Sequence, residues 1–281
     1  PYFLPDQIQE NAPLLTGLLK RIRNELNERG RERGRPIRLA VRVDETLRGC
    51  RQDGFEVKRW IDEGLVDMII LGSGVIDIDV GAFKQLTRGT EVTVHPCLYG
   101  WPSKYMPIPR DMACASALNY WAQGADGLYL FNWFPHQKNN SEATGAYQQE
   151  LLRKLGDPQK ILAGEHNYLF AADRGRPAAE YPGNWLDCIL PMELKRGGAT
   201  VFRLRTTGLP TNTTAAQIRL QFDDPVQASS VSARIHETDL KLHGASSNVL
   251  TATLSSDKLL RGDNQVRVSL SAGQATLRAA E

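Results

Sequence analysis

The chain has 281 residues, of which 41% are hydrophobic and 23% are charged, a composition typical of a soluble globular protein with one large or two ordinary domains. Its 34 basic and 32 acidic side chains leave a net charge of +2, which argues against a protein that binds nucleic acid through overall charge. No apolar run of about 18 residues occurs, so no membrane span is predicted.

The cysteines and the first residues add little about function. Cys50, Cys97, Cys114 and Cys188 have neither CxxC nor metal-ligand spacing, so we interpret them as small buried apolar residues and expect no metal or cofactor. The sequence starts at Pro1 without an initiator Met or a signal peptide, so we expect it to be the remainder of a longer chain. The compartment is not determined by the sequence, and a periplasmic or extracellular location is favoured.

The first 157 residues alternate between helical and strand patterns. Helices are predicted at 8–30, 55–65, 79–89, 109–125 and 141–156, and strands at 37–43, 66–72, 91–100 and 127–134. The strands are apolar nearly throughout and are spaced like βα units, which is typical of a parallel sheet. We therefore predict an α/β domain over residues 1–160.

The pattern changes near residue 160. Short strand-like runs separated by Gly, Pro, Asn, Asp and Ser follow at 166–172, 188–194, 199–207, 215–224, 231–244, 248–255 and 264–273. No long helical pattern interrupts them, and 171–184 resembles a long loop. This is typical of an antiparallel β-sandwich, which we predict over residues 161–281.

Polar and aromatic residues follow the predicted parallel strands. They are Arg42, Asp44 and Glu45 after the first strand, Gly72–Gly74 after the second, His95, Tyr99 and Trp101 at the third, and Asn132, Trp133 and His136 at the fourth. Ligands of parallel α/β proteins bind at the carboxyl ends of the strands, so we expect these side chains to share one rim. Carboxylates, a guanidinium, an amide and large aromatic rings suit a polyhydroxylated ligand.

Structural roles for the same residues remain open. Trp133 and Phe134 could cap the apolar core, and His95 could make one backbone hydrogen bond at a strand end. Arg42 could pair with Asp44, and Glu45 could belong to the N-cap region of the loop that follows. The Gly72–Gly74 turn lacks the spacing of a nucleotide-binding loop, and neither GxSxG nor HExxH occurs.

The segments "IRLAVRVDETLRGCRQDGFEVKRWIDEGLVDMIILGSG", "EVTVHPCLYG" and "ADGLYLFNWF" resemble the second half of uncharacterised bacterial glycoside hydrolase-like proteins with (β/α)8 barrels. This resemblance implies that residues 37–134 hold barrel strands five to eight, and that the first four strands are missing. The runs "SARIHETDL" and "LLRGDNQVRVSL" are similar to galactose-binding-like accessory modules of the sandwich type.

The resemblance implies hydrolysis of a poly- or oligosaccharide by carboxyl groups at the barrel rim. Asp44 or Glu45 would be the acid/base, with His95 at the strand end where such barrels commonly carry a nucleophilic acid. Substrate binding would fall to Arg42, Tyr99, Trp101, Asn132, Trp133 and His136. A second carboxylate would have to lie upstream of Pro1.

Two other interpretations remain. A degenerate barrel could bind carbohydrate or act as a scaffold without cleaving it, or the four βα units could form a complete open α/β domain with a small-molecule activity. A half-barrel leaves two unpaired sheet edges, so we expect it to need its missing half or another copy of itself.

Overall fold

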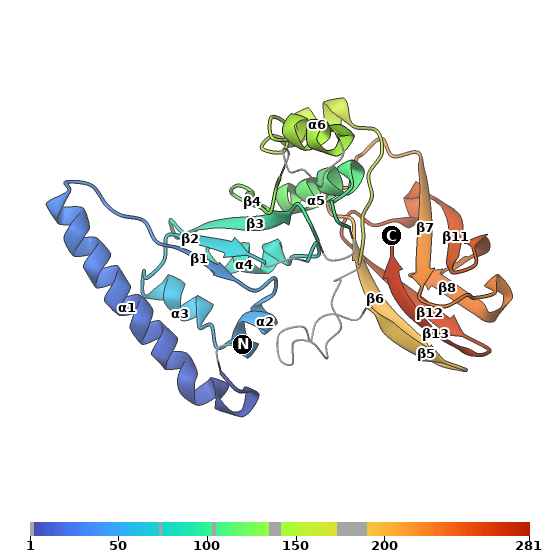
Figure 1. Cartoon of the computed structure of the whole chain (residues 1–281), viewed down its shortest axis with the longest axis horizontal. Coiled ribbons are helices and arrows are strands. Elements are labelled where there is room, and N and C mark those ends of the chain that lie inside the picture. The colour runs from blue at the N-terminus through green and yellow to red at the C-terminus, as the bar shows by residue number, and fades with distance from the viewer. Residues whose placement is uncertain (1–2, 73–74, 103–104, 135–141, 173–189) are drawn as a thin grey trace.

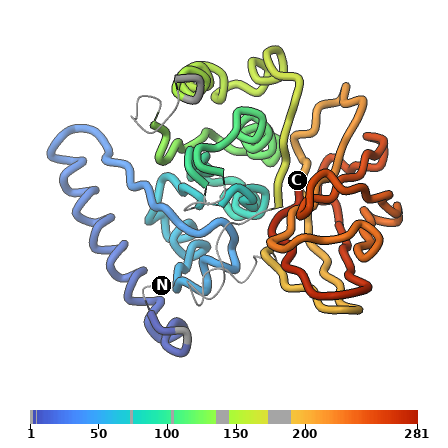
Figure 2. Tube along the Cα trace, turned by 45° about the vertical axis from the view of Figure 1, so that its right-hand side comes forward, coloured from blue at the N-terminus to red at the C-terminus, as the bar shows by residue number. Residues whose placement is uncertain are grey.

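The computed structural model describes residues 3–72, 75–102, 105–134, 142–172 and 190–281. Two regions lie side by side, an α/β region formed by residues 3–172 and a β region formed by residues 190–281 (Figure 1). The long helix α1 lies on the side of the α/β region that faces away from the β region, and the C-terminal end of the chain lies at the junction (Figure 2). No described helix is long and apolar enough to cross a membrane.

The α/β region confirms the predicted alternation of helices and strands. Its elements are η1 (Pro5–Gln7), α1 (Ile8–Glu32), β1 (Ala40–Val43), α2 (Leu47–Gln52), α3 (Val57–Asp62), β2 (Met68–Leu71), α4 (Val80–Leu86), β3 (Thr93–Tyr99), α5 (Arg110–Ala122), β4 (Tyr129–Phe131), α6 (Glu142–Leu151) and α7 (Pro158–Gly164). The short helices α2 and α7 were not predicted, because six or seven residues are too few for a helical repeat of apolar residues to be visible.

The four strands form one parallel sheet in the order β1-β2-β3-β4. Arg42 pairs with Ile70, Ile70 pairs with His95, and Tyr99 pairs with Phe131. Each strand lies next to the strand that precedes it in the chain. Right-handed crossovers in this order place the connecting helices on the same face of the sheet.

One face of the sheet carries the core of the α/β region. Val43, Leu71 and Leu98 point to this face and share a single cluster with Phe83 of α4 and Met112 of α5. The core continues past residue 160, since Ile161 and Leu169 also pack in it. The helices therefore cover the first face of the sheet.

The opposite face, which we call the concave face, is much less covered. Its side chains alternate with those of the core, and they include Arg42, Ile70, His95, Cys97, Tyr99, Tyr129 and Phe131. Ile70 and Cys97 are buried, whereas Arg42 is exposed and Tyr129 is 37% exposed.

The sheet curves toward this face. The guanidinium carbon of Arg42 in β1 lies 4.5 Å from the centre of the Phe131 ring in β4, although two strands separate them. In a flat sheet β1 and β4 would be roughly 14 Å apart, and Phe131 is also displaced along its strand. One-sided helices, sequential strand order and curvature are together consistent with part of a barrel.

The β region consists of antiparallel strands, as predicted. Its strands are β5 (Met192–Lys195), β6 (Ala199–Arg205), β7 (Ala215–Phe222), β8 (Val231–Ile235), β9 (Thr238–Leu240), β10 (His243–Ser246), β11 (Val249–Ser255), β12 (Asp263–Leu270) and β13 (Gln274–Ala280), with short 3-10 turns η3 (Ala228–Ser230) and η4 (Ser256–Lys258). They form a five-stranded sheet, β10-β11-β7-β13-β5, and a four-stranded sheet, β6-β12-β8-β9. Leu220 and Leu277 of the first sheet and Val268 of the second share one core, which is consistent with a β-sandwich.

One sequence expectation for this part is wrong, and one strand was not predicted. Residues 166–172 do not form a strand, because Tyr168 and Leu169 pack against the α/β core and Ala172 against the β core, so the segment connects two cores. The final strand β13 was not predicted; it alternates buried and less buried residues, but it contains three alanines and an arginine, which are weak strand formers.

Arg205 of β6 joins the two regions. Its side chain is 7% exposed, donates to the carbonyl oxygen of Ile78 at 2.8 Å and to Oε1 of Gln123 at 2.7 Å, and pairs with Asp79 at 3.2 Å. It also pairs with Asp263 of its own region at 2.9 Å. One buried cation therefore satisfies groups from both regions and fixes their relative position.

Gly208 brings the backbones of the two regions into contact. Its N–H donates to Oδ1 of Asn119 in α5 at 3.0 Å, and Nδ2 of Asn119 donates to the carbonyl of Arg205 at 2.9 Å. A Cβ at position 208 would lie 2.5 Å from the carbonyl carbon of Leu118. Only glycine permits this approach.

The predicted burial of cysteines is confirmed for Cys50, Cys97 and Cys114, which are free thiols. Cys188, and the part of the predicted loop from residue 173 onward, lie outside the described residues.

Candidate active site at the carboxyl end of the parallel sheet

The acidic residues Asp44 and Glu45 follow directly after β1, and both are buried, at 8% and 2% exposure. Oδ1 of Asp44 accepts a hydrogen bond from the N–H of Thr46 at 3.2 Å. A Cβ at Gly49 would lie 2.0 Å from the same oxygen, so the side chain of Asp44 fills the space beside the first turn of α2. The turn after β1 thus directs Asp44 toward α2.

Glu45 lies over the end of β2. A Cβ at Gly72 would be 3.3 Å from Cγ of Glu45, and Gly72 has a φ of +99°, which favours glycine for a second reason. The carbonyl oxygen of Glu45 accepts from the N–H of Asp79 at 3.0 Å. The turns after β1 and β2 and the start of α4 therefore enclose this residue.

Burial dominates the electrostatics of the pair. Loss of solvent, together with the neighbouring charge and hydrogen bond of Glu45, raises the pKa of Asp44 to about 9. Asp44 therefore keeps its proton at neutral pH and donates it to Glu45 in a hydrogen bond. A carboxylic acid that stays protonated at pH 7 is the chemical form needed by a general acid.

A second cluster lies on the concave face, toward the carboxyl end of the strands. The ring of Phe131 stacks on Tyr99 with the centroids 5.3 Å apart, and Tyr129 stacks on Phe131 at 6.5 Å. Arg42 covers Phe131, and Nδ2 of Asn132 donates to the hydroxyl of Tyr99 at 2.9 Å. The structure thus brings the predicted residues Arg42, Tyr99 and Asn132 together.

The close approach of β3 and β4 holds Asn132 in place. Asn132 has a φ of 49°, a left-handed conformation that asparagine adopts more readily than most residues. A Cβ at Gly100 would lie 2.4 Å from its carbonyl oxygen, so glycine is required where the two strand ends meet.

The remaining predicted site residues lie outside these two clusters. His95 is in the middle of β3, where Nε2 lies 3.1 Å from Oγ1 of Thr93 and the ring rests against Gly127, and burial lowers its pKa. Trp133 packs against the α/β core, and its Nε1 donates to the carbonyl of Gln148 in α6 at 3.1 Å. Asp44, His95 and Trp133 therefore do not meet at a common opening. Trp133 matches the structural alternative that the sequence left open, whereas the hydrogen bond of His95 is to the side chain of Thr93 and not to the backbone.

Trp101 contacts Phe134 edge to face, with the centroids 5.6 Å apart. Its Nε1 is buried and has no hydrogen-bond partner among the described residues. His136 lies outside the described residues. Within those residues, no three His, Cys, Asp or Glu side chains are grouped as metal ligands.

Sequence reasoning missed Tyr129 and Phe131, since the apolar run 127–134 was treated as a strand buried on both faces. The available signal was alternation: Leu128 and Leu130 pack on the core, so Tyr129 and Phe131 must point to the other face.

No protein-family model matches the chain, and no curated protein matches it. Solved structures with weak similarity include two glycoside hydrolases. One is a β-porphyranase of glycoside hydrolase family 86 from the human gut bacterium Bacteroides plebeius, with 19% identity and a TM-score of 0.27 over 31% of this chain and 17% of that one. The other is a family GH115 4-O-methyl-α-glucuronidase with specificity for decorated arabinogalactans, with 11% identity and a TM-score of 0.23 over 79% of this chain and 33% of that one. The chain thus spans a third or less of either structure's length.

Proposed function

We propose that the chain is part of a glycoside hydrolase-like protein that acts on an oligo- or polysaccharide at the carboxyl end of a barrel of which β1 to β4 form half. The observation that carries this proposal is the acid pair after β1, in which buried Asp44 keeps its proton at neutral pH. Protonation of a glycosidic oxygen requires a carboxyl group of this kind.

The pair would supply one of the two carboxyl functions that hydrolysis needs. Asp44 and Glu45 share a hydrogen bond, so they are closer than the roughly 5 Å that separates the two carboxyl groups of retaining enzymes. They cannot lie on opposite sides of one glycosidic bond. A second carboxylate would have to come from another segment that covers the concave face.

The cluster on the concave face would bind the sugar. Arg42 and Asn132 offer planar hydrogen-bond donors, and Tyr99 and Tyr129 offer a hydroxyl and aromatic surface. The sheet edge of β1 and that of β4 would pair with the other half of the barrel, which would turn the concave face into the wall of a closed site.

The test is hydrolysis of a glycan panel by the chain together with whatever segment completes the barrel. Asp44→Asn and Glu45→Gln are each expected to lower kcat at least about 100-fold, because general acid catalysis contributes this much. Asp53→Asn is the comparison variant, since Asp53 is also a buried acid but lies at the end of α2. Its charge is the smallest of the causes that raise the pKa of Asp44, so this variant should lower kcat far less than the other two. Equal activity of Asp44→Asn, Glu45→Gln and wild type would refute the assignment.

A non-catalytic carbohydrate-binding protein is the second candidate. It is favoured by the enclosure of Asp44 and Glu45, while Arg42 and Tyr129 remain exposed on the concave face. It predicts saturable glycan binding by calorimetry without release of reducing ends. Arg42→Ala would weaken this binding, whereas Glu45→Gln would not.

A further inference from the structure

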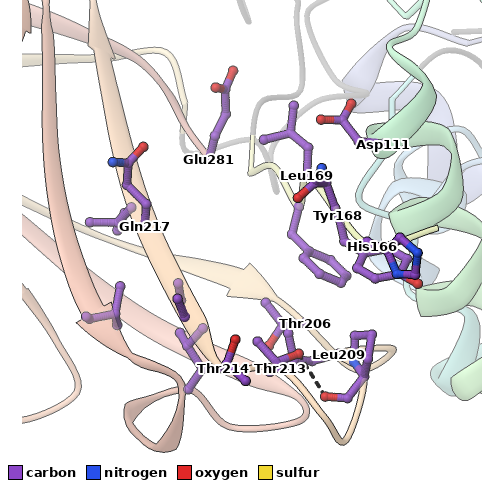
Figure 3. Close-up of a pocket in the computed structure, with 18 of the residues that line it drawn as sticks. Asp111, His166, Tyr168, Leu169, Thr206, Leu209, Thr213, Thr214, Gln217 and Glu281 are labelled. Carbon is purple, nitrogen blue, oxygen red and sulfur yellow. Dashed lines mark hydrogen bonds between the residues drawn. The ribbon is translucent and has the colours of Figure 1, made fainter. Parts of the chain in front are cut away.

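A cleft with a volume of about 840 Å³ lies between the two regions (Figure 3). One wall is the connecting segment 165–170 together with Asp111 of α5, and the other is β7 and the loop 209–214 that precedes it. In Figure 3, His166 and Tyr168 face Thr213, Thr214 and Gln217 across the opening. The volume is in the range typical of sites for small ligands.

The cleft is preformed. The N–H of Leu169 donates to the carbonyl of Asp111 at 3.3 Å, which fixes the connecting segment to α5. Asn119 of the same helix binds Gly208, just before the loop that forms the other wall. Since both walls are attached to α5, a ligand would not have to order the walls on binding.

The charge of the described lining disfavours anionic ligands. Among the described residues that line the cleft, none is Lys or Arg, whereas Asp111, Glu165 and Glu281 are acidic. Basic side chains that contact these lining residues are engaged: Arg110 pairs with Glu150 and Glu165, Arg219 lies 3.8 Å from Glu281, and Arg261 donates to the carbonyl of Pro210 at 3.0 Å. Within the described lining, a phosphate, sulfate or uronate would meet these acidic groups and no lysine or arginine.

The lining suits a neutral polyhydroxylated ligand. Tyr168 and Phe170 provide aromatic surface, and Asn167 and Gln217 provide amides that make no side-chain hydrogen bond within the described part of the chain. The loop Thr211–Thr214 adds hydroxyl groups beside them. Aromatic faces pack on the C–H surfaces of sugar rings, while amides and hydroxyls bind sugar hydroxyls.

We propose that this cleft is a binding site for a neutral oligosaccharide. Its residues are distinct from those of the acid pair and of the concave face, so the proposal does not depend on whether Asp44 and Glu45 catalyse hydrolysis. In a carbohydrate-active protein, such a site would hold a glycan chain away from the reacting bond.

The experiment is titration calorimetry of the full 281-residue chain with cellohexaose, xylohexaose, mannohexaose and laminarihexaose. At least one is expected to bind saturably at millimolar concentration or below. Gln217→Trp, which places a large ring in the cleft from an exposed strand position, is expected to weaken binding at least about tenfold, and Asn167→Ala to weaken it several-fold. Arg267→Trp, at an exposed position of β12 outside the cleft, is the matched control and should bind like wild type.

Three results would overturn the proposal: no binding of any hexaose, binding that Gln217→Trp and Asn167→Ala leave unchanged, or binding of spermine or a sulfated oligosaccharide in the cleft in place of the neutral sugars. Arg42→Ala separates the two sites. If it removes hexaose binding while Gln217→Trp does not, the ligand occupies the concave face and the cleft proposal fails. If the reverse holds, the cleft binds sugar whatever the fate of the proposed hydrolase activity.

Discussion

The two regions bury their sheets in different ways. In the β region, two antiparallel sheets cover each other, so β12 alternates buried Val266, Val268 and Leu270 with exposed outward residues. In the α/β region, helices cover one face of the parallel sheet, while Arg42 and Tyr129 remain exposed on the other. The β region thus has a complete core of its own between its two sheets. The charged and aromatic side chains lie on the parallel sheet, of which only one face is covered by a core.

The largest expected effect is the loss of a core side chain in each region. Phe83 and Leu220 are both fully buried, in separate clusters. Phe83→Ala should cost about 3–5 kcal/mol and Leu220→Ala about 2–5 kcal/mol. In chemical denaturation, Phe83→Ala should lower the midpoint of the transition followed by tryptophan fluorescence, to which buried Trp60 contributes. Leu220→Ala should lower mainly the midpoint of the transition of the β strands followed by circular dichroism. Identical shifts of one common transition would show that the regions unfold as a unit.

The junction provides the next comparison. Gly208→Ala places a methyl group against the backbone of α5 and should cost about 1–3 kcal/mol, because the backbones have to separate. Gly262→Ala is the control, since a Cβ there meets nothing within 4 Å. Limited proteolysis between the regions should accelerate in Gly208→Ala only. If both variants resist proteolysis equally, the backbones at the junction can move apart without exposing the chain to the protease.

The pH dependence of stability distinguishes the buried acid from the rest of the molecule. The carboxyl of Asp44 ionises near 3.8 when unfolded and near 9 when folded, so between these values the folded state binds an extra proton. The free energy of unfolding therefore falls as the pH rises through this window, by up to about 1.4 kcal/mol per pH unit.

Asp44→Asn should remove this slope, because an amide does not titrate. Urea denaturation at several pH values between 5 and 9 measures the slope in both proteins. A slope that is unchanged in Asp44→Asn would show that Asp44 is already ionised when folded.

The smallest expected effect concerns helix caps within the α/β region. Thr46 accepts from the N–H of Gly49 at 2.9 Å beside the acid pair, and Asp157 accepts from the N–H of Gln159 at 2.9 Å at an exposed site. Thr46→Ala and Asp157→Ala should each cost about 1 kcal/mol. Only Thr46→Ala should also change the pH slope, because the capping hydroxyl of Thr46 holds the turn whose backbone N–H donates to Asp44. If the free energy of unfolding has the same pH slope in both variants, the Thr46 cap does not influence the ionisation of Asp44.

The alternation of elements was predictable because strand patterns such as 66–72 and helix patterns such as 8–30 are local properties of the chain. The placement of side chains was predictable only within a strand, as for Arg42, which must point away from the core face of Val41 and Val43. His95 and Trp133 lie in the predicted strands 91–100 and 127–134, but His95 packs on Gly127 and Trp133 contacts α6. Those neighbours are far away in the chain, so no local pattern could reveal them.

The interregion cleft was not predictable for a related reason. Tyr168 and Gln217 belong to segments that the sequence assigns to one β domain, yet the structure places them on opposite walls. The connecting segment was mistaken for a strand because it is rich in apolar residues. Some of these residues pack in the α/β core and others in the β core.

Arg205 has a consequence for ligand selection. The guanidinium of Arg205 binds Ile78, Asp79 and Gln123 at the same time. Any rotation of the β region would leave this buried cation without these partners, which is energetically costly. The width of the gap between Tyr168 and Gln217 is thus set before anything enters it. If the cleft binds an oligosaccharide as proposed, a glycan of the wrong thickness would be rejected by shape alone, without a moving gate.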